Sequence, residues 1–320
     1  MSDESLRFAL ALVLAVFLGG CVRVTGSSMD GPSSDSRPVD GIDRDAGADA
    51  VPTDLGNTDT VPPDKPFGPA LALEGVNDPT LGEDDPCVTG DMLELYFERD
   101  GDLWISRRTS TADPWPAATR VAELNTTGNE SSPAVSADGL RMIFARNAGD
   151  GEKYDIYVST RESRIGSWRV PSAVAGVNSS ATDAAAVSTA DLLVMIVGSD
   201  RSGGLGDRDL WIASRDDPFA TFTEPINLAA LNSSSLEDGP WISGDGQLLF
   251  FRSNRAGGVG LSDIWFATRT DVGGSFSAPA LVPGVNTSEA EGDPWLSPDL
   301  RTIYFTRNVG GQQDLFVATR

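Results

Sequence analysis

Short apolar runs recur from residue 67 to residue 320, separated by segments rich in Gly, Ser, Asp and Asn. Between Gly239 and Asp293 these runs are PWIS, LLFFRS, DIWFATR and SFSAPALV, and turn-forming residues lie between them. Runs of this length with such boundaries predict β-strands. In DIWFATR both alternating sets of side chains include apolar residues, which is typical of a strand covered on both faces. The pattern therefore predicts four-stranded units that pack face to face.

The unit occurs five times, as three sets of regularly spaced residues indicate. An Asp precedes an Arg by six residues at Asp102 and Arg108, Asp155 and Arg161, Asp209 and Arg215, Asp263 and Arg269, and Asp314 and Arg320. An aromatic residue precedes an Asn by ten residues at Phe67 and Asn77, Trp115 and Asn125, Trp168 and Asn178, Phe222 and Asn232, and Phe276 and Asn286. A Ser or Thr stands eight residues before the end of an apolar run at Thr89, Ser136, Ser188, Ser243 and Ser297. Successive copies are 47 to 55 residues apart, a period typical of propeller blades.

The two ends of the repeat region complement each other. The chain ends at Arg320, directly after a third strand, whereas the region from Phe67 to Asn77 corresponds to a fourth strand. Pairing of these segments would close a ring and leave only short strand edges. The sequence therefore predicts an all-β fold, a five-bladed β-propeller over residues 67–320 closed by an N-terminal strand.

The repeat carries motifs of a known family. These are the Ser-x-Asp-Gly turns that begin at Ser136 and Ser243, and the Asp-aliphatic-aromatic strand starts at Asp102, Asp155, Asp209, Asp263 and Asp314. The repeat resembles the WD-repeat-like propeller repeats of TolB and related bacterial envelope proteins. The third copy departs from the pattern at Ser188-Thr189-Ala190-Asp191. This resemblance implies the propeller fold and transfers no catalytic residue.

The N-terminal region has the pattern of a lipoprotein signal. The apolar run from Phe8 to Leu18 is too short to span a bilayer and ends in Leu18-Gly19-Gly20-Cys21. This ending resembles the lipobox of bacterial lipoproteins, which implies a signal peptide over residues 1–20 and a lipid anchor on Cys21. Asp3 and Glu4 offset Arg7, a departure from the usual positive start. The alternative is an ordinary signal peptide in which Cys21 has no role.

Residues 21–66 are rich in Asp, Pro and Ser and show no period, so we expect a disordered linker. Val22 and Arg23 follow Cys21, and the absence of Asp there resembles lipoproteins sorted to the outer membrane. The expected location is therefore the cell envelope, lipid-anchored, at the outer membrane.

The overall composition excludes several functional classes. The net charge of −23 disfavours a nucleic-acid partner. The chain contains no His, which removes Ser-His and Cys-His nucleophile pairs and the usual zinc sites. The second of two cysteines, Cys87, is expected to be a buried apolar residue. We expect a monomer without a cofactor, and the sequence does not decide whether a metal binds.

Charged residues recur in the loops expected on one face of the propeller, which we call the upper face. Four acids stand three residues before the Pro that opens the inner strand, namely Glu83, Glu130, Glu237 and Glu291, and Asp183 lies within one residue of the equivalent position. The loops between the second and third strands contribute Arg99, Arg146, Arg201, Arg255 and Arg307. These residues form either structural ion pairs that help to fix each blade against the next, the favoured interpretation, or a polar site for a cation, sugar or peptide at the channel mouth.

Two further sets recur in register. Blade packing is the expected role of the rings at Trp104, Tyr157, Trp211 and Trp265. The Asn-x-Ser/Thr sequences at Asn125, Asn178, Asn232 and Asn286 are interpreted as loop caps rather than glycosylation sites.

These observations favour a binding or scaffold module for an envelope protein, a peptide or a cell-wall glycan. The alternative is an extracytoplasmic glycoside hydrolase that uses carboxylates at the channel mouth, because such enzymes need two carboxyl groups and no His. The acids recur equivalently in every blade, whereas a catalytic site should break the symmetry. A structural spacer in an envelope complex is a third possibility.

Overall fold

The computed structural model describes residues 62–147 and 153–320. The predicted signal peptide, Cys21 and the linker up to residue 61 lie outside the described residues. Within the described ranges, the chain forms no helix long and apolar enough to cross a membrane.

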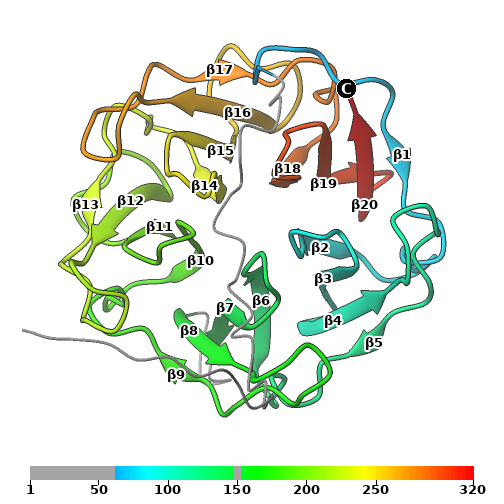
Figure 1. Ribbon diagram of the computed structural model, residues 1–320. Helices are drawn as coiled ribbons and strands as arrows, with labels where there is room; N and C mark the ends of the chain where they lie inside the picture. The colour runs from blue at the N-terminus through cyan, green and yellow to red at the C-terminus, as the bar shows by residue number, and fades with distance from the viewer. Residues whose placement is uncertain (1–61, 148–152) are drawn as a thin grey trace, which may run out of the picture. The chain divides into compact units, whose positions relative to one another are not determined.

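Within the described residues, twenty strands form five antiparallel four-stranded sheets around a central axis, which confirms the predicted five-bladed β-propeller (Figure 1). The first blade is β2 (Glu83–Val88), β3 (Glu94–Arg99), β4 (Asp102–Arg107) and β5 (Thr119–Arg120). The second is β6 (Asn129–Val135), β7 (Arg141–Asn147), β8 (Tyr154–Thr160) and β9 (Ser172–Ala173). The third is β10 (Asp183–Ser188), β11 (Val194–Ser199), β12 (Asp209–Ser214) and β13 (Ile226–Asn227). The fourth is β14 (Glu237–Ile242), β15 (Leu248–Ser253), β16 (Asp263–Thr268) and β17 (Ala280–Leu281).

The fifth blade joins the two ends of the repeat region, as predicted. Its strands are β18 (Glu291–Leu296), β19 (Thr302–Val309), β20 (Gln312–Thr319) and the N-terminal β1 (Leu71–Ala72). Leu71 pairs with Val317, and the Arg320 guanidinium lies 4.3 Å from the centre of the Phe67 ring. Arg320 also donates hydrogen bonds to the carbonyls of Pro63 and Lys65. The N-terminal segment therefore completes the last sheet.

The repeated residues hold each blade together through the same contacts. The Arg after the third strand stacks on the aromatic residue of the following loop, as Arg161 does on Trp168 at 4.5 Å. It also donates to a carbonyl of the turn between the first two strands, as in the 2.7 Å bond from Arg161 to Gly139. The repeated Asn clamps the third strand: Asn232 accepts from the Leu210 N–H at 2.9 Å and donates to the Leu210 carbonyl at 2.9 Å. The prediction of a local loop cap is therefore corrected, because these side chains bond the backbone of a strand 22 residues earlier.

The turn of the third blade differs from the prediction by one residue. Thr189, not Ser188, donates its hydroxyl hydrogen bond to Asp191, at 2.6 Å, as Thr89 does to Asp91 at 2.7 Å. Thr189 follows Asp183 by six residues, the same spacing that separates Thr89 from Glu83. Asp183 therefore occupies the equivalent position rather than one displaced by a residue.

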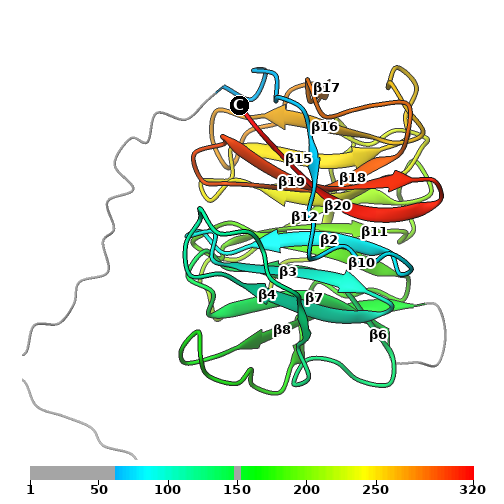
Figure 2. The ribbon, with the colours of Figure 1, turned by 90° about the vertical axis from the view of Figure 1, so that its right-hand side faces the viewer.

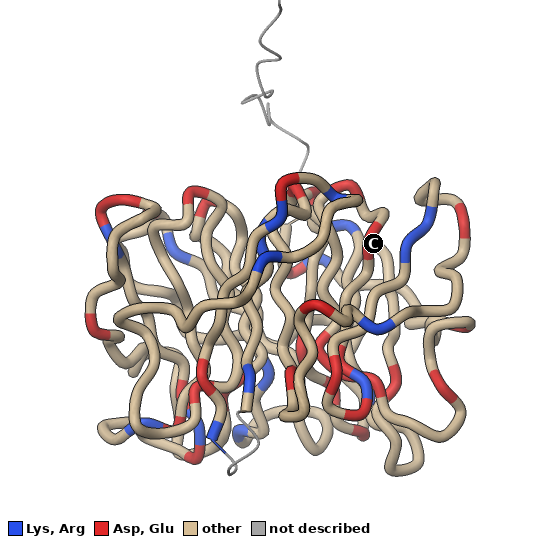
Figure 3. The backbone as a smooth tube through the Cα atoms, turned by 90° about the horizontal axis from the view of Figure 1, so that it is seen from below, with Lys and Arg blue, Asp and Glu red and all other residues tan. Residues whose placement is uncertain are grey.

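Seen from the side, the strands run roughly along the propeller axis between two faces made of loops (Figure 2). Inner strands begin at the upper face, which carries the loops between second and third strands and the connections from blade to blade. The lower face carries the turns between first and second strands and the loops between third and fourth strands. Acidic and basic positions occur along the loops at both faces (Figure 3).

Candidate functional site

The five acids predicted for the channel mouth are fully buried at the starts of the inner strands, each 0% exposed: Glu83, Glu130, Asp183, Glu237 and Glu291. Each forms an ion pair with the predicted arginine of its own blade. The N–O distances are 2.6 Å to Arg99, 2.9 Å to Arg146, 2.5 Å to Arg201, 3.0 Å to Arg255 and 2.7 Å to Arg307.

The second blade illustrates what these pairs do. Glu130 accepts hydrogen bonds from the Thr126 N–H at 2.9 Å and the Thr126 hydroxyl at 2.7 Å. Arg146 donates to the Leu124 carbonyl at 2.7 Å, and its guanidinium lies 4.9 Å from the centre of the Tyr157 ring. The pair thus fixes the connection between blades, and the ring contact supports a packing role for the recurring aromatic residues. Because these carboxylates are buried, a ligand cannot reach them, and the alternative of a polar binding site made of them at the channel mouth is corrected.

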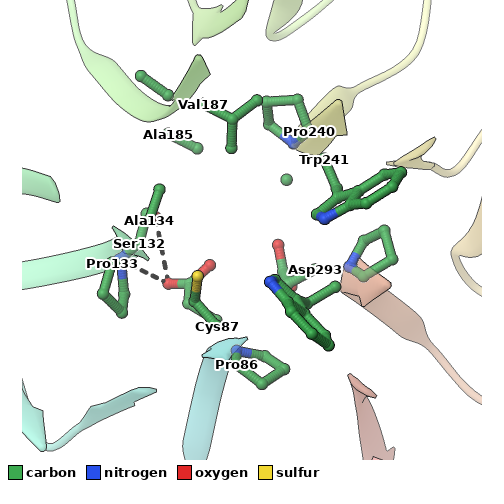
Figure 4. Close-up of a pocket in the computed structure, with 15 residues that line it drawn as sticks. Pro86, Cys87, Ser132, Pro133, Ala134, Ala185, Val187, Pro240, Trp241 and Asp293 are labelled. Carbon is green, nitrogen blue, oxygen red and sulfur yellow. Dashed lines mark hydrogen bonds between the residues drawn. The ribbon is translucent and has the colours of Figure 1, made fainter. Parts of the chain in front are cut away.

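A separate group of residues faces the centre of the propeller. A cavity of about 50 Å³ in the channel is lined by residues two to four positions beyond each buried acid, among them Asp85, Cys87, Trp241, Asp293 and Trp295 (Figure 4). In the close-up, Trp241 and Asp293 border the open centre together with Pro86 and Pro240. The Cys87 thiol accepts a hydrogen bond from the Val135 N–H at 3.2 Å, and burial raises its pKa to about 12.

Backbone bulges in the inner strands place Asp85 and Asp293 at the channel. The pairing register of the inner strand shifts between Asp84 and Cys87 and between Gly292 and Trp295. Within the bulges Asp85 and Asp293 have φ values of 55° and 51°, in the left-handed region that non-Gly residues seldom adopt. A Pro follows each of them, which further restricts the backbone. The bulge separates Glu83, which turns to Arg99, from Asp85, which lines the channel.

The five blades are not equivalent at this position, which is occupied by Asp85, Ser132, Ala185, Gly239 and Asp293 in chain order. Asp85 and Asp293, together with Asp84, place carboxylate oxygens within 4.8 Å of one another. Asp85 accepts hydrogen bonds from the Ser132 N–H and hydroxyl at 3.0 and 3.1 Å. The first and fifth blades therefore place a carboxylate in the channel and the other three do not, so the five-fold symmetry expected of purely structural acids is broken here.

Charges behind the channel wall set the electrostatics of this site. Arg252 lies 3.3 Å from Asp293 and 3.8 Å from Asp238, which also pairs with Arg208. Burial and the neighbouring carboxylates raise the pKa of Asp85 well above its usual value. Burial, together with Asp84 and Asp238, likewise raises the pKa of Asp293, against the opposing effect of Arg252. The channel wall therefore favours an added positive charge or a proton.

The same carboxylates have the oxygen donors that a hard cation such as Ca²⁺ prefers. Several of these oxygens already accept hydrogen bonds, because Thr306 and Gln313 bind Asp84 at 2.7 Å each and Ser132 binds Asp85. We therefore assign no metal to them.

The sequence contains one signal for the site: an Asp stands directly before the inner-strand Pro in only two of the five copies.

Among the comparisons with known proteins, only the one with solved structures found matches. No protein-family model and no curated protein matches the sequence. An endo-arabinase from Bacteroides thetaiotaomicron is 13% identical with a TM-score of 0.56, covering 80% of this chain and 98% of that one. An α-L-arabinofuranosidase from Lactobacillus brevis is 12% identical with a TM-score of 0.55, covering 78% and 94%. A putative TolB from Agrobacterium tumefaciens is 17% identical with a TM-score of 0.47, covering 75% and 76%.

These solved structures include propeller glycoside hydrolases and a putative TolB. At such identities the likeness to the hydrolases establishes a shared propeller fold and no activity. The class of protein is therefore a five-bladed β-propeller with an asymmetric acidic channel.

Proposed function

We propose that this propeller is a recognition module of the bacterial cell envelope, held at a membrane by a lipid on Cys21. Its ligand, an envelope protein, a peptide or a cell-wall glycan, places a positively charged group in the channel against Asp85 and Asp293. The observation that carries this proposal is the channel cavity, in which carboxylates from two blades lie beside the indoles of Trp241 and Trp295.

The size of the cavity supports recognition of a projecting group. Pockets that enclose a whole small molecule occupy about 300–1,000 Å³. The cavity of about 50 Å³ suits the size of an ammonium or guanidinium group. Because Asp85 and Asp293 have raised pKa values, such a ligand must displace protons. Affinity for a cationic ligand should therefore rise with pH as the two carboxyl groups ionise.

The second candidate is a glycoside hydrolase, which the broken symmetry of the channel favours. Asp85 and Asp293 have unequal surroundings, since Ser132 binds one and Arg252 the other. Retaining glycosidases place two carboxyl groups about 5–5.5 Å apart, and raised pKa values suit a general acid. The fold shared with the endo-arabinase and the α-L-arabinofuranosidase supports this candidate, whereas the small cavity supports recognition more than hydrolysis.

One titration series distinguishes the two functions. The full chain and its Asp85→Asn, Asp293→Asn and Glu123→Gln variants are mixed with lysine-containing tripeptides, amino-bearing peptidoglycan fragments, and arabino- and xylo-oligosaccharides. Asn is the appropriate replacement because it tolerates left-handed backbone. Glu123 is an exposed acid outside the channel and serves as the matched control. Binding heat and released sugar are both recorded.

Recognition predicts binding without turnover, weakened at least tenfold by Asp293→Asn and unchanged by Glu123→Gln. Turnover that one Asp variant abolishes would replace this proposal with the hydrolase. Equal binding by all four proteins would place the ligand outside the channel.

A further inference from the structure

Two neighbouring loops of the upper face hold aliphatic side chains in solvent. The β11–β12 loop, residues 200–208, exposes Leu205 by 55%, and the β15–β16 loop, residues 254–262, exposes Val259 by 58% and Leu261 by 73%. In the first blade the corresponding turn consists only of Asp100 and Gly101. We call these two loops of the third and fourth blades the aliphatic rim.

The backbone of the aliphatic rim is fixed by hydrogen bonds. The Leu205 N–H donates to Asp209 at 2.5 Å, and the Val259 N–H donates to Asp263 at 2.9 Å. The Leu261 N–H donates to the Glu289 carbonyl at 2.8 Å, which ties the loop to the next blade. These exposed side chains therefore project from a backbone that is already organised for contact, which lowers the entropic cost of binding.

Glycines make this geometry possible. A Cβ atom at Gly206 would collide with the Ser235 carbonyl, and one at Gly260 would collide with the Glu289 carbonyl. Both loops share the pattern Gly-Gly-aliphatic-Gly, so that each holds its aliphatic residue, Leu205 or Val259, on a tightly packed backbone.

The charge around the aliphatic rim is negative. Asp200, Asp207 and Glu289 are exposed. The arginines of the two loops are engaged by buried acids, since Arg201 pairs with Asp183, Arg208 with Asp238 and Arg255 with Glu237. The rim thus presents aliphatic groups beside exposed carboxylates, and the complementary surface combines aliphatic and basic groups.

We propose that the aliphatic rim is a docking surface for a polypeptide segment that presents aliphatic and basic side chains together. The segment packs its aliphatic groups on Leu205, Val259 and Leu261, and its basic groups lie near Asp200, Asp207 and Glu289. This contact is separate from the channel site, because none of these six residues lines the channel cavity.

The test uses a fluorescent twelve-residue peptide of alternating Leu and Lys, with the full chain titrated against it in about 150 mM salt. The rim variant carries Leu205→Ser, Val259→Ser and Leu261→Ser. The control carries Ile165→Ser and Phe219→Ser, which remove exposed apolar groups on the lower face, 100% and 91% exposed. Thermal unfolding is measured for both variants to check that they fold, which is expected because the substituted positions are exposed.

The proposal predicts at least tenfold weaker binding for the rim variant and an unchanged affinity for the control. It also predicts that a photoreactive group on the peptide labels residues 200–208 or 254–262. Equal affinity of rim variant and wild type would overturn the proposal, as would labelling confined to other loops. A peptide with Glu in place of Lys should bind at least tenfold more weakly, and equal binding would contradict the predicted role of the carboxylates.

Discussion

Replacing Glu130 by Gln tests the structural role of the buried ion pairs. Glu130 is 0% exposed, and the side chain of its partner Arg146 is 14% exposed, so the substitution leaves a guanidinium with little access to water. Breaking a buried pair from one side costs about 3–5 kcal/mol. The residual exposure of Arg146 and the bonds that Gln retains to Thr126 place the expected cost near the lower end, at about 3 kcal/mol. For a domain of this size that cost lowers the melting temperature by about 6–12 °C.

Thermal unfolding followed by circular dichroism measures the effect. The matched control is Glu162→Gln, because Glu162 and Arg169 form a pair whose side chains are 84% and 64% exposed. An exposed pair contributes at most about 1 kcal/mol, so its loss should change the melting temperature little. The double variant Glu130→Gln/Arg146→Met should cost less than the sum of its single changes. If Glu130→Gln melts like Glu162→Gln, the structural account of the buried pairs is refuted.

Three further predictions concern closure, pH and the anchor. A chain beginning at residue 78 lacks β1 and should melt well below one beginning at residue 62, because blade five loses an edge strand; equal melting would contradict closure by β1. Burial raises the pKa of Glu98 to about 7, so the folded state binds more protons between about pH 4.5 and 7 and stability falls as pH rises through that window. Glu98→Gln should remove up to about 3 kcal/mol of that fall, and an unchanged pH profile in urea titrations would argue against it. In cells given a fatty-acid analogue, wild type should be labelled and Cys21→Ser should not, and equal labelling would exclude the lipid anchor.

The blade architecture was predictable because every blade reuses local contacts at fixed spacing. The Arg after the third strand, the aromatic residue of the next loop and the clamping Asn act within one blade, so their spacing appears directly in the sequence. Thr189 was missed because Ser188 offers the same hydroxyl one position earlier. Only the six-residue distance from Asp183 distinguishes Thr189 from Ser188 as the residue of the turn.

The candidate site was less predictable because it depends on backbone geometry and burial. Strict alternation places Glu83 and Asp85 on the same side of a strand, and only the bulge separates them. Spacing also does not reveal that the acids of the ion pairs are completely buried. The sequence repeats the buried acids in every blade, whereas an Asp at the position of Asp85 and Asp293 occurs in only two copies and forms no repeat.

Site-specific photocrosslinking in living cells tests the channel most directly. A photoreactive phenylalanine analogue replaces Trp241, which lines the cavity, and in a control it replaces Ile226, an outer-strand residue that is 69% exposed. We predict a discrete adduct at position 241, absent at position 226 and lost when Asp293→Asn is added. An adduct at position 241 that persists with Asp293→Asn, or identical adducts at both positions, would contradict a ligand site in the channel.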